Sequence, residues 1–397
     1  MDYPVMKKVI CIGLSLMFVG VSVFAGANDG FDDGIDRSDS NFVIASLIMV
    51  SSSDSLYSGL GHVCIRLECP KFNLDCCYTE ESEDVGHRVL TYFAGKLRMG
   101  MFAMKTEKFL SGFRTERRGV RQYRLNLPPE VKQRLWKAFD ERVAQGPNMP
   151  YDYEKRGCAW AVLSCILEAL GPVKLEIPEW TEKYDLTRRE LMHRVLGEYP
   201  WNMFFLHAIW GAALDKDLPK LEKIVVPRDL LEFLKKARIG GVPVVDGSSV
   251  ELVADGRPPH SPTWFTPMAA AVLLLLLSVI RLVLSSSRWR IVLDGLFLAL
   301  QSAAGLFFCY LVCFSSLPAT TWNWLIVPFN LLPLILWRWR RRWAWPFVAV
   351  LVAWEALMLL YPHQLTDWAY VVIVLAYIVF YVKQGSPNLV RPTFFRR

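Results

Sequence analysis

LGHVCIR, residues 60–66, is the stretch that decides the fold of the first half of this 397-residue chain. Val63, Ile65 and Leu67 alternate with other side chains, which predicts a strand that starts near His62. A second segment, GCAW at residues 157–160, opens an apolar run that ends at a Gly-Pro pair, the pattern of a helix with Cys158 in its first turn. A thiol at a helix N-terminus and an imidazole on a strand can together form a thiolate nucleophile.

The overall composition indicates a membrane protein, because 53% of the residues are hydrophobic and the mean hydropathy is +0.25. The net charge of +7 forms no basic stripe with interleaved aromatic residues, so nucleic acid is not an expected partner. Residues 1–25 combine Lys7 and Lys8 with an apolar core and small residues at the end, which predicts a signal peptide. An uncleaved N-terminal anchor is the alternative.

The region between the signal and the apolar C-terminal part is predicted to be an α+β domain over residues 41–240. It follows an acidic, Gly-rich lead-in over residues 26–40 and precedes a Gly-, Ser- and Pro-rich linker over residues 241–263. Strand patterns come first and helical patterns follow. The strands are expected over 42–50, 62–68, 74–79 and 120–127, and the helices over 129–144, 159–170, 187–197, 201–214 and 228–237.

The C-terminal part, residues 264–385, is predicted to hold five membrane-spanning helices, since each apolar run is near the ~20 residues that a span requires. The runs cover residues 265–286, 291–315, 320–337, 344–361 and 366–383. Arginines follow the first and third runs and end the tail over residues 386–397, whereas the other two loops have no Lys or Arg. The positive-inside rule makes the arginine-bearing loops and the tail cytoplasmic. Five spans then place the α+β domain outside, as the signal peptide also requires.

Two segments, taken in order, match the landmarks of one known family. Tyr57 followed by Gly61 to Arg66 resembles a Y…GHxxxR segment, and Tyr151-Asp152-Tyr153 followed by Cys158-Ala159 resembles a YDY…NCA segment. In this order the two segments resemble a family of exported membrane proteins from Bacteroidota-type bacteria, the Lnb-type lipoprotein N-acyltransferases. The resemblance implies a circularly permuted papain-like (NlpC/P60-like) periplasmic domain, in which the histidine precedes the cysteine, followed by a transmembrane bundle.

The resemblance also implies an activity, with the catalytic domain on the periplasmic side of the inner membrane. Cys158 would be the nucleophile and His62 its base. An acyl chain would move from a membrane phospholipid, through a Cys thioester, to the α-amine of the N-terminal diacylglyceryl-cysteine of lipoproteins, without a metal or soluble cofactor. This chain departs from the family pattern at Gly157, where Asn is usual, and at residues 77–79, where Asn-Tyr-Gly is usual. Tyr78 is the candidate that orients His62, and a core tyrosine is the alternative.

Other readings of the same residues stay open. A cysteine peptidase or amidase, or a phospholipase, would use the same thiol, and a non-catalytic membrane scaffold with an exported binding domain needs no thiol. His62 with Cys64 and the cysteines at 69, 76 and 77 lacks the paired spacing of a zinc site. Asn323 and Asn330 lie seven apart in the third predicted span, so they would share a helix face and either line a lipid groove or bond between helices.

Overall fold

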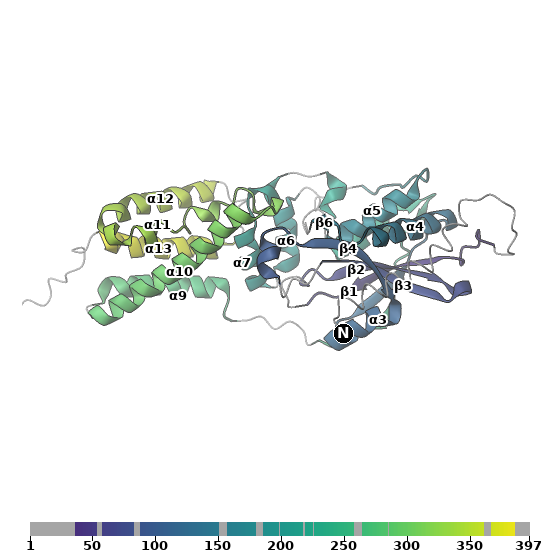
Figure 1. Ribbon diagram of the computed structural model, residues 1–397, viewed down its shortest axis with the longest axis horizontal. Helices are drawn as coiled ribbons and strands as arrows, with labels where there is room; N and C mark the ends of the chain where they lie inside the picture. Colours follow the sequence, from purple (N-terminus) through teal and green to yellow (C-terminus); the bar gives the residue numbers. More distant parts are fainter. Residues whose placement is uncertain are drawn as a thin grey trace, which may run out of the picture. The chain divides into compact units, whose positions relative to one another are not determined.

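The computed structural model describes most of the chain, and the chain divides into two compact units (Figure 1). The first unit comprises residues up to 181 together with 219–258, and the second comprises 182–218 together with 259–397. The predicted signal peptide, Tyr57 and the segment 151–156 lie outside the described residues. The described ranges are 36–53, 58–82, 88–150, 157–179, 186–197, 199–216, 219–224, 226–257, 264–284, 286–360 and 367–385.

A seven-stranded sheet in the order β6-β4-β3-β2-β1-β5-β9 forms the centre of the first unit. Every neighbouring pair in it is antiparallel. The strands are β1 (Ile44–Val50), β2 (His62–Cys69), β3 (Leu74–Ser82), β4 (Arg98–Lys105), β5 (Val120–Arg124), β6 (Met149–Pro150) and β9 (Val250–Val253). Sheet and helices together confirm the predicted α+β class. Part of the predicted linker is an edge strand instead, because β9 pairs with β5.

Helices cover both faces of this sheet, as the alternation of side chains along β3 demands. Cys77 belongs to an apolar cluster that includes Phe109 of α3 (Thr106–Glu116). The next residue, Tyr78, points to the other face and stacks on Phe139 of α4 (Pro129–Gln145). The same face of the sheet carries α5 (Cys158–Leu170), which packs along α4 and against β2 and β3. The other elements of the unit are α2 (Val89–Phe93), α8 (Pro227–Lys236), β7 (Arg238–Ile239) and β8 (Val242–Pro243).

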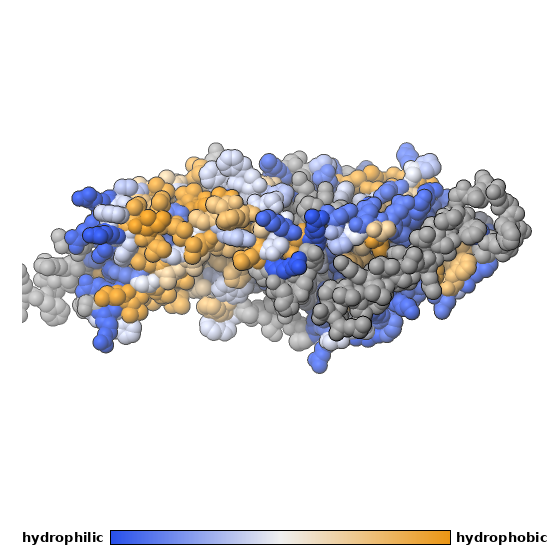
Figure 2. Space-filling model, viewed as in Figure 1, coloured by the Kyte–Doolittle hydropathy of each residue, from blue (hydrophilic) through white to orange (hydrophobic). Residues whose placement is uncertain are grey.

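The second unit contains long apolar helices whose outer surfaces are hydrophobic (Figure 2). By length and composition, residues Arg288–Phe314 and Trp337–Leu360 could each cross a membrane, and two further apolar helices have 17 residues each. Large apolar side chains such as Leu306 and Leu359 are more than half exposed, which suits contact with lipid rather than water. The helices are α6 (Arg188–Leu196), α7 (Pro200–Ile209), α9 (Pro267–Val283), α10 (Ser287–Phe314), α12 (Arg340–Leu360) and α13 (Ala369–Gly385).

The prediction of a helix over residues 320–337 is wrong. That stretch holds only short pieces: η7 (Trp324–Ile326), α11 (Leu332–Ile335) and η8 (Trp337–Trp339). Pro328 and Pro333 explain the interruption, because proline lacks the N–H of a helical hydrogen bond and its ring clashes with the preceding turn. Neighbouring α10 compensates the irregular backbone: Gln301 donates to the Pro328 carbonyl at 2.7 Å, and the absence of a side chain at Gly305 lets the backbone at Asn330 approach.

Asn323 and Asn330 therefore do not share a helix face. Each is at a turn, where its side-chain oxygen accepts from the backbone N–H two residues later, in Leu325 and Leu332 respectively. The amide of Asn323 also donates to the carbonyl of Ala208 in α7 at 2.7 Å. In the structure both asparagines hold the broken segment in shape.

Residues that follow α7 pair with the loop between α10 and η7. The Gly211 N–H donates to the Ala319 carbonyl at 2.6 Å, and the Tyr370 hydroxyl at the start of α13 donates to Phe204 in α7 at 2.5 Å. This end of the second unit carries the loop without Lys or Arg. Arg290 and Arg340 lie in the first turns of α10 and α12.

Candidate functional site

Cys158 is the first residue of α5, with Gly157 as an extended N-cap. Its thiol is partly buried, and the backbone N–H groups of Val63, Ala159 and Cys158 itself act on it to lower its pKa. These donors come from a helix N-terminus and from the neighbouring strand β2. Such a set of N–H groups is suited to stabilising negative charge on sulfur or on an adjacent oxygen.

His62 is the first residue of β2, one residue before the Val63 N–H that meets the thiol. Its Nε2 is hydrogen-bonded to the Thr79 hydroxyl at 2.7 Å. The preceding residue, Gly61, has a φ of +78°, and a Cβ there would lie 2.8 Å from the Val50 carbonyl oxygen. Only glycine fits that turn without strain, and the turn sets where the strand and its histidine begin.

The structure brings Cys158 to β2 but, among the described residues, shows no hydrogen bond between Cys158 and His62. Ile65 pairs with Tyr78 in the register of β2 and β3, so His62 and Thr79 lie on one face of the sheet and Val63 on the other. The Cys158 thiol interacts with the backbone N–H of Val63. His62 is the residue before Val63, at the start of the same strand.

Tyr78, the predicted partner of His62, is not beside the histidine. Its hydroxyl donates to Asp140 of α4 at 2.6 Å, on the face opposite Thr79. Thr79 fills the position beside the imidazole instead. The strand alternation carried the signal for this, because residues two apart on β3 share a face and consecutive ones do not.

Both candidate groups are neutral near pH 7 in this state. Burial, reinforced by the negative charge of Glu80, raises the pKa of the Cys158 thiol to about 11, although the N–H donors act in the opposite direction. Burial and the positive charge of Arg118 lower the pKa of His62 to about 4. The thiol is therefore protonated and the imidazole is unprotonated, and an unprotonated imidazole is a group that can accept a proton.

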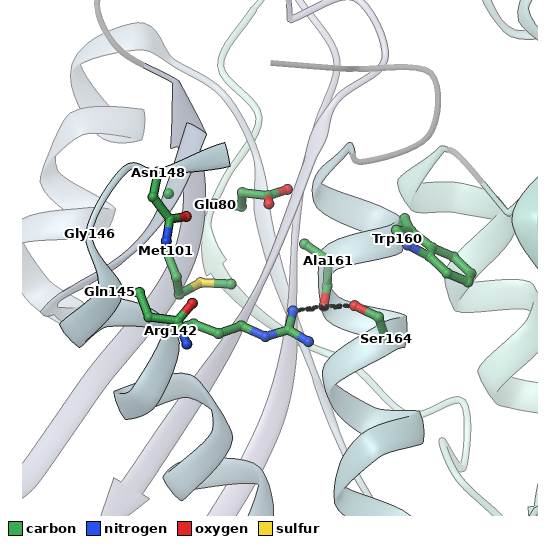
Figure 3. Close-up of a pocket in the computed structure, with 10 residues that line it drawn as sticks. Glu80, Met101, Arg142, Gln145, Gly146, Asn148, Trp160, Ala161 and Ser164 are labelled. Atoms are coloured by element: carbon green, nitrogen blue, oxygen red, sulfur yellow. Dashed lines mark hydrogen bonds between the residues drawn. The ribbon is translucent and has the colours of Figure 1, made fainter. Parts of the chain in front are cut away.

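A cavity of about 240 Å³ adjoins the first turns of α5 (Figure 3). Figure 3 shows Glu80 of β3 on one wall, Trp160 and Ser164 of α5 on another, and the Arg142 guanidinium of α4 reaching toward Ala161. Sequence reasoning did not identify Glu80 or Arg142 as site residues. Their contribution depends on the packing of α4 and α5 over β3, which no local pattern specifies.

The other cysteines that the structure describes in the first unit are unbridged thiols. Cys64 and Cys165 are both completely buried. Within the described ranges, no group of three or more His, Cys, Asp or Glu side chains could hold a metal ion. Core packing is thus the role that the structure gives Cys165 in α5.

We expect the stability of the fold to fall as the pH drops from about 6.5 toward 4, partly because of His62. The unfolded chain protonates this histidine near pH 6.5, whereas the folded chain resists protonation until about pH 4, so acid favours unfolding in this window. Asp140, whose pKa is raised to about 6 by burial, acts in the opposite direction. Thermal melts of wild type and His62→Asn in detergent should show the wild type losing ~5 °C more between pH 6.5 and 4.5. Equal losses would contradict the assignment.

A comparison with known families places the site in context. Residues 34–194 match the family model described as Lnb N-terminal periplasmic domain. No curated protein and no solved structure matches the chain. The matched range includes β1 to α5 and therefore His62, Thr79, Glu80 and Cys158.

Proposed function

This chain belongs to the Lnb family through residues 34–194, and we propose that it is a lipoprotein N-acyltransferase of the bacterial inner membrane. The observation that carries the proposal is the Cys158 thiol at the N-terminus of α5, on which the backbone N–H of Val63 acts from the strand that begins with His62. The second unit, with its lipid-compatible helices, supports a substrate that is delivered from a membrane. The periplasmic position of the catalytic unit and the multi-pass topology are parts of this proposal.

In the first half of the proposed reaction, His62 accepts the thiol proton and Cys158 attacks an ester carbonyl of a phospholipid. The N–H groups of Val63 and Ala159 would stabilise the oxyanion. The ester C–O bond breaks, the lysophospholipid takes the proton from His62, and a thioester remains. Catalytic hydrogen bonds commonly tighten only when substrate is bound, so the absent His62–Cys158 bond is compatible with this step.

In the second half, the α-amine at the N-terminus of a diacylated lipoprotein attacks the thioester. The C–S bond breaks, an amide forms, and Cys158 recovers its proton. A hydrolase would use water as the acceptor at the same step. The substrates named here follow from the family, and the thiol is the group in this chain that would carry the acyl chain between them.

The acyl-transfer proposal is tested in a bacterial strain that lacks its own lipoprotein N-acylation. The full chain is expressed there, and the N-terminal peptides of lipoproteins are analysed by mass spectrometry. We expect an amide-linked third acyl chain on the N-terminal cysteine. Unmodified amines, in cells where the protein is present in the membrane, would refute the proposed function, and release of free fatty acid would favour a phospholipase.

We expect Thr79→Val to lower kcat/KM roughly 10- to 100-fold, because a misplaced base loses part of the ~10²–10⁴-fold that positioned proton transfer contributes. The change removes the hydroxyl that bonds His62 Nε2 while keeping the shape of the side chain. Thr79→Ser retains a hydroxyl and should restore most of the rate. A Val variant with wild-type kinetics and an unshifted pH profile would show that Thr79 does not position His62.

A further inference from the structure

The cavity beside α5 is not used by any step proposed above. Its volume of about 240 Å³ is below the ~300–1,000 Å³ of pockets that hold drug-sized ligands. A polar chain end or a head group fits such a space, whereas two long acyl chains do not. Its walls combine an acid, Glu80, with a cation, Arg142, and the indole of Trp160 (Figure 3).

Glu80 lines the cavity together with Trp160 and Ala161 of the first turns of α5, the helix that begins at Cys158. Glu80 follows Tyr78 by two residues on β3, so its side chain lies on the face of the sheet that α4 and α5 cover. Glu80 is only 7% exposed, and it lines the cavity. Its negative charge also acts on the thiol, whose pKa it helps to raise.

A carboxylate at this position works against the first half-reaction, because negative charge disfavours the thiolate. An acid there is therefore better explained by a later step that needs it. The cation of the same cavity is already engaged: Arg142 donates to Glu168 at 3.0 Å and to the Ser164 hydroxyl at 3.3 Å. Because the positive charge of Arg142 is paired with Glu168, the carboxylate of Glu80 makes the cavity suited to a positively charged ligand.

We infer that the Glu80 cavity binds a primary ammonium group of a substrate and holds it beside Cys158. This inference rests on the proposed function, which offers two sources of such a group: the α-amine of the acceptor lipoprotein and the ethanolamine head group of a phospholipid donor. The acceptor is favoured, because its nitrogen must reach the thioester carbon. The head group need only be near the site.

In the second half-reaction Glu80 would position the amine and accept one of its protons. The acceptor arrives as an ammonium with three hydrogens on nitrogen. One proton passes to the Glu80 carboxylate and then to solvent, which frees the lone pair for attack on the thioester carbon. The C–S bond breaks, a second proton goes to the Cys158 sulfur, and the amide nitrogen keeps one hydrogen.

The test separates the two half-reactions of the full-length protein in detergent micelles. Thioester formation on Cys158 is measured by intact-protein mass spectrometry, with phosphatidylethanolamine or phosphatidylglycerol as donor. Acyl transfer is then measured to a synthetic diacylated lipopeptide and to hydroxylamine, a nucleophile that is neutral at pH 7. We expect Glu80→Gln to form the thioester and to react with hydroxylamine as wild type does, but to acylate the lipopeptide at least ~10-fold more slowly with a raised KM.

Controls and contrary outcomes are built into the same assay. Glu141→Gln removes an acid from α4 whose side chain is 57% exposed, and it should leave every step unchanged. Glu80→Asp keeps the charge and should recover part of the lipopeptide rate. A Glu80→Gln defect confined to thioester formation from phosphatidylethanolamine would assign the cavity to the donor head group. The inference would be overturned if Glu80→Gln used donor and lipopeptide as well as the wild-type protein does, or if it lost every step equally. If the wild-type protein itself formed no thioester, the proposed function would be refuted.

Discussion

Cys158→Ala is expected to abolish lipoprotein N-acylation, with a loss of about 10⁴-fold or more, since replacing a nucleophile removes covalent catalysis altogether. The fold should survive, because the thiol is at the partly buried N-terminal turn of α5 and the substitution introduces alanine, the best helix former. The measurement is acyl transfer to a diacylated lipopeptide, accompanied by a search for a thioester adduct on residue 158. Neither product nor adduct should be detected.

Cys165→Ala is the matched control for this experiment. Cys165 is in the same helix, two turns further on, and its side chain is completely buried. Loss of the sulfur leaves a small cavity, so the variant should melt a few degrees lower while retaining its activity. If Cys158→Ala still acylates the lipopeptide, or if only Cys165→Ala loses activity, the assignment of the nucleophile fails.

Local patterns were sufficient to predict the elements that hold the candidate nucleophile and base. The alternating stretch that begins at residue 62 is strand β2 (His62–Cys69) in the structure. The apolar run before the Gly-Pro pair is helix α5 (Cys158–Leu170). Both predictions depend on the periodicity of apolar side chains and on residues that end a helix or strand, and both signals act over a few residues. Strand β4 (Arg98–Lys105) was not predicted, because its sequence RMGMFAMK mixes glycine, methionine and charge without clear alternation.

The broken third segment shows what a count of apolar residues leaves out. The run over 320–337 is hydrophobic enough for a span, yet Pro328 and Pro333 interrupt any helix in it. The prolines were visible in the sequence. Their effect on the backbone was not predictable from hydropathy, which measures transfer to lipid and is blind to the hydrogen bonds that proline removes.

Contacts between distant residues could not be predicted at all. Residues 188–216 carry helix patterns that say nothing about their neighbours, yet Gly211 pairs with Ala319 and these helices group with the apolar unit. The roles proposed for Thr79 and Glu80 likewise depend on the pairing of β3 with β2 and on the packing of α5. A one-residue change of register would exchange their two faces.

Arg189→Met should destabilise the second unit by about 3–5 kcal/mol, the typical cost of breaking a buried ion pair by removing one partner. The guanidinium of Arg189 in α6 is 1% exposed and donates to both carboxylate oxygens of Asp215, at 2.8 and 3.1 Å. It also donates to the Gly211 carbonyl at 2.7 Å, next to the Gly211 N–H that pairs with Ala319. Methionine fills much of the space but leaves the acid and the carbonyl buried without this donor.

The matched control for this prediction is Arg194→Met, which removes an exposed arginine from the same helix and should change the melting temperature little. The double variant Arg189→Met/Asp215→Leu should recover part of the loss, because it removes the stranded acid together with its partner. Melting temperatures of the four proteins in one detergent form a test of the pair. A single variant Arg189→Met as stable as Arg194→Met would show that this ion pair does not hold α6 to the segment after α7. Loss of the pair should also loosen the loop that precedes the broken third segment, because the backbone N–H of Gly211 donates to Ala319 in that loop.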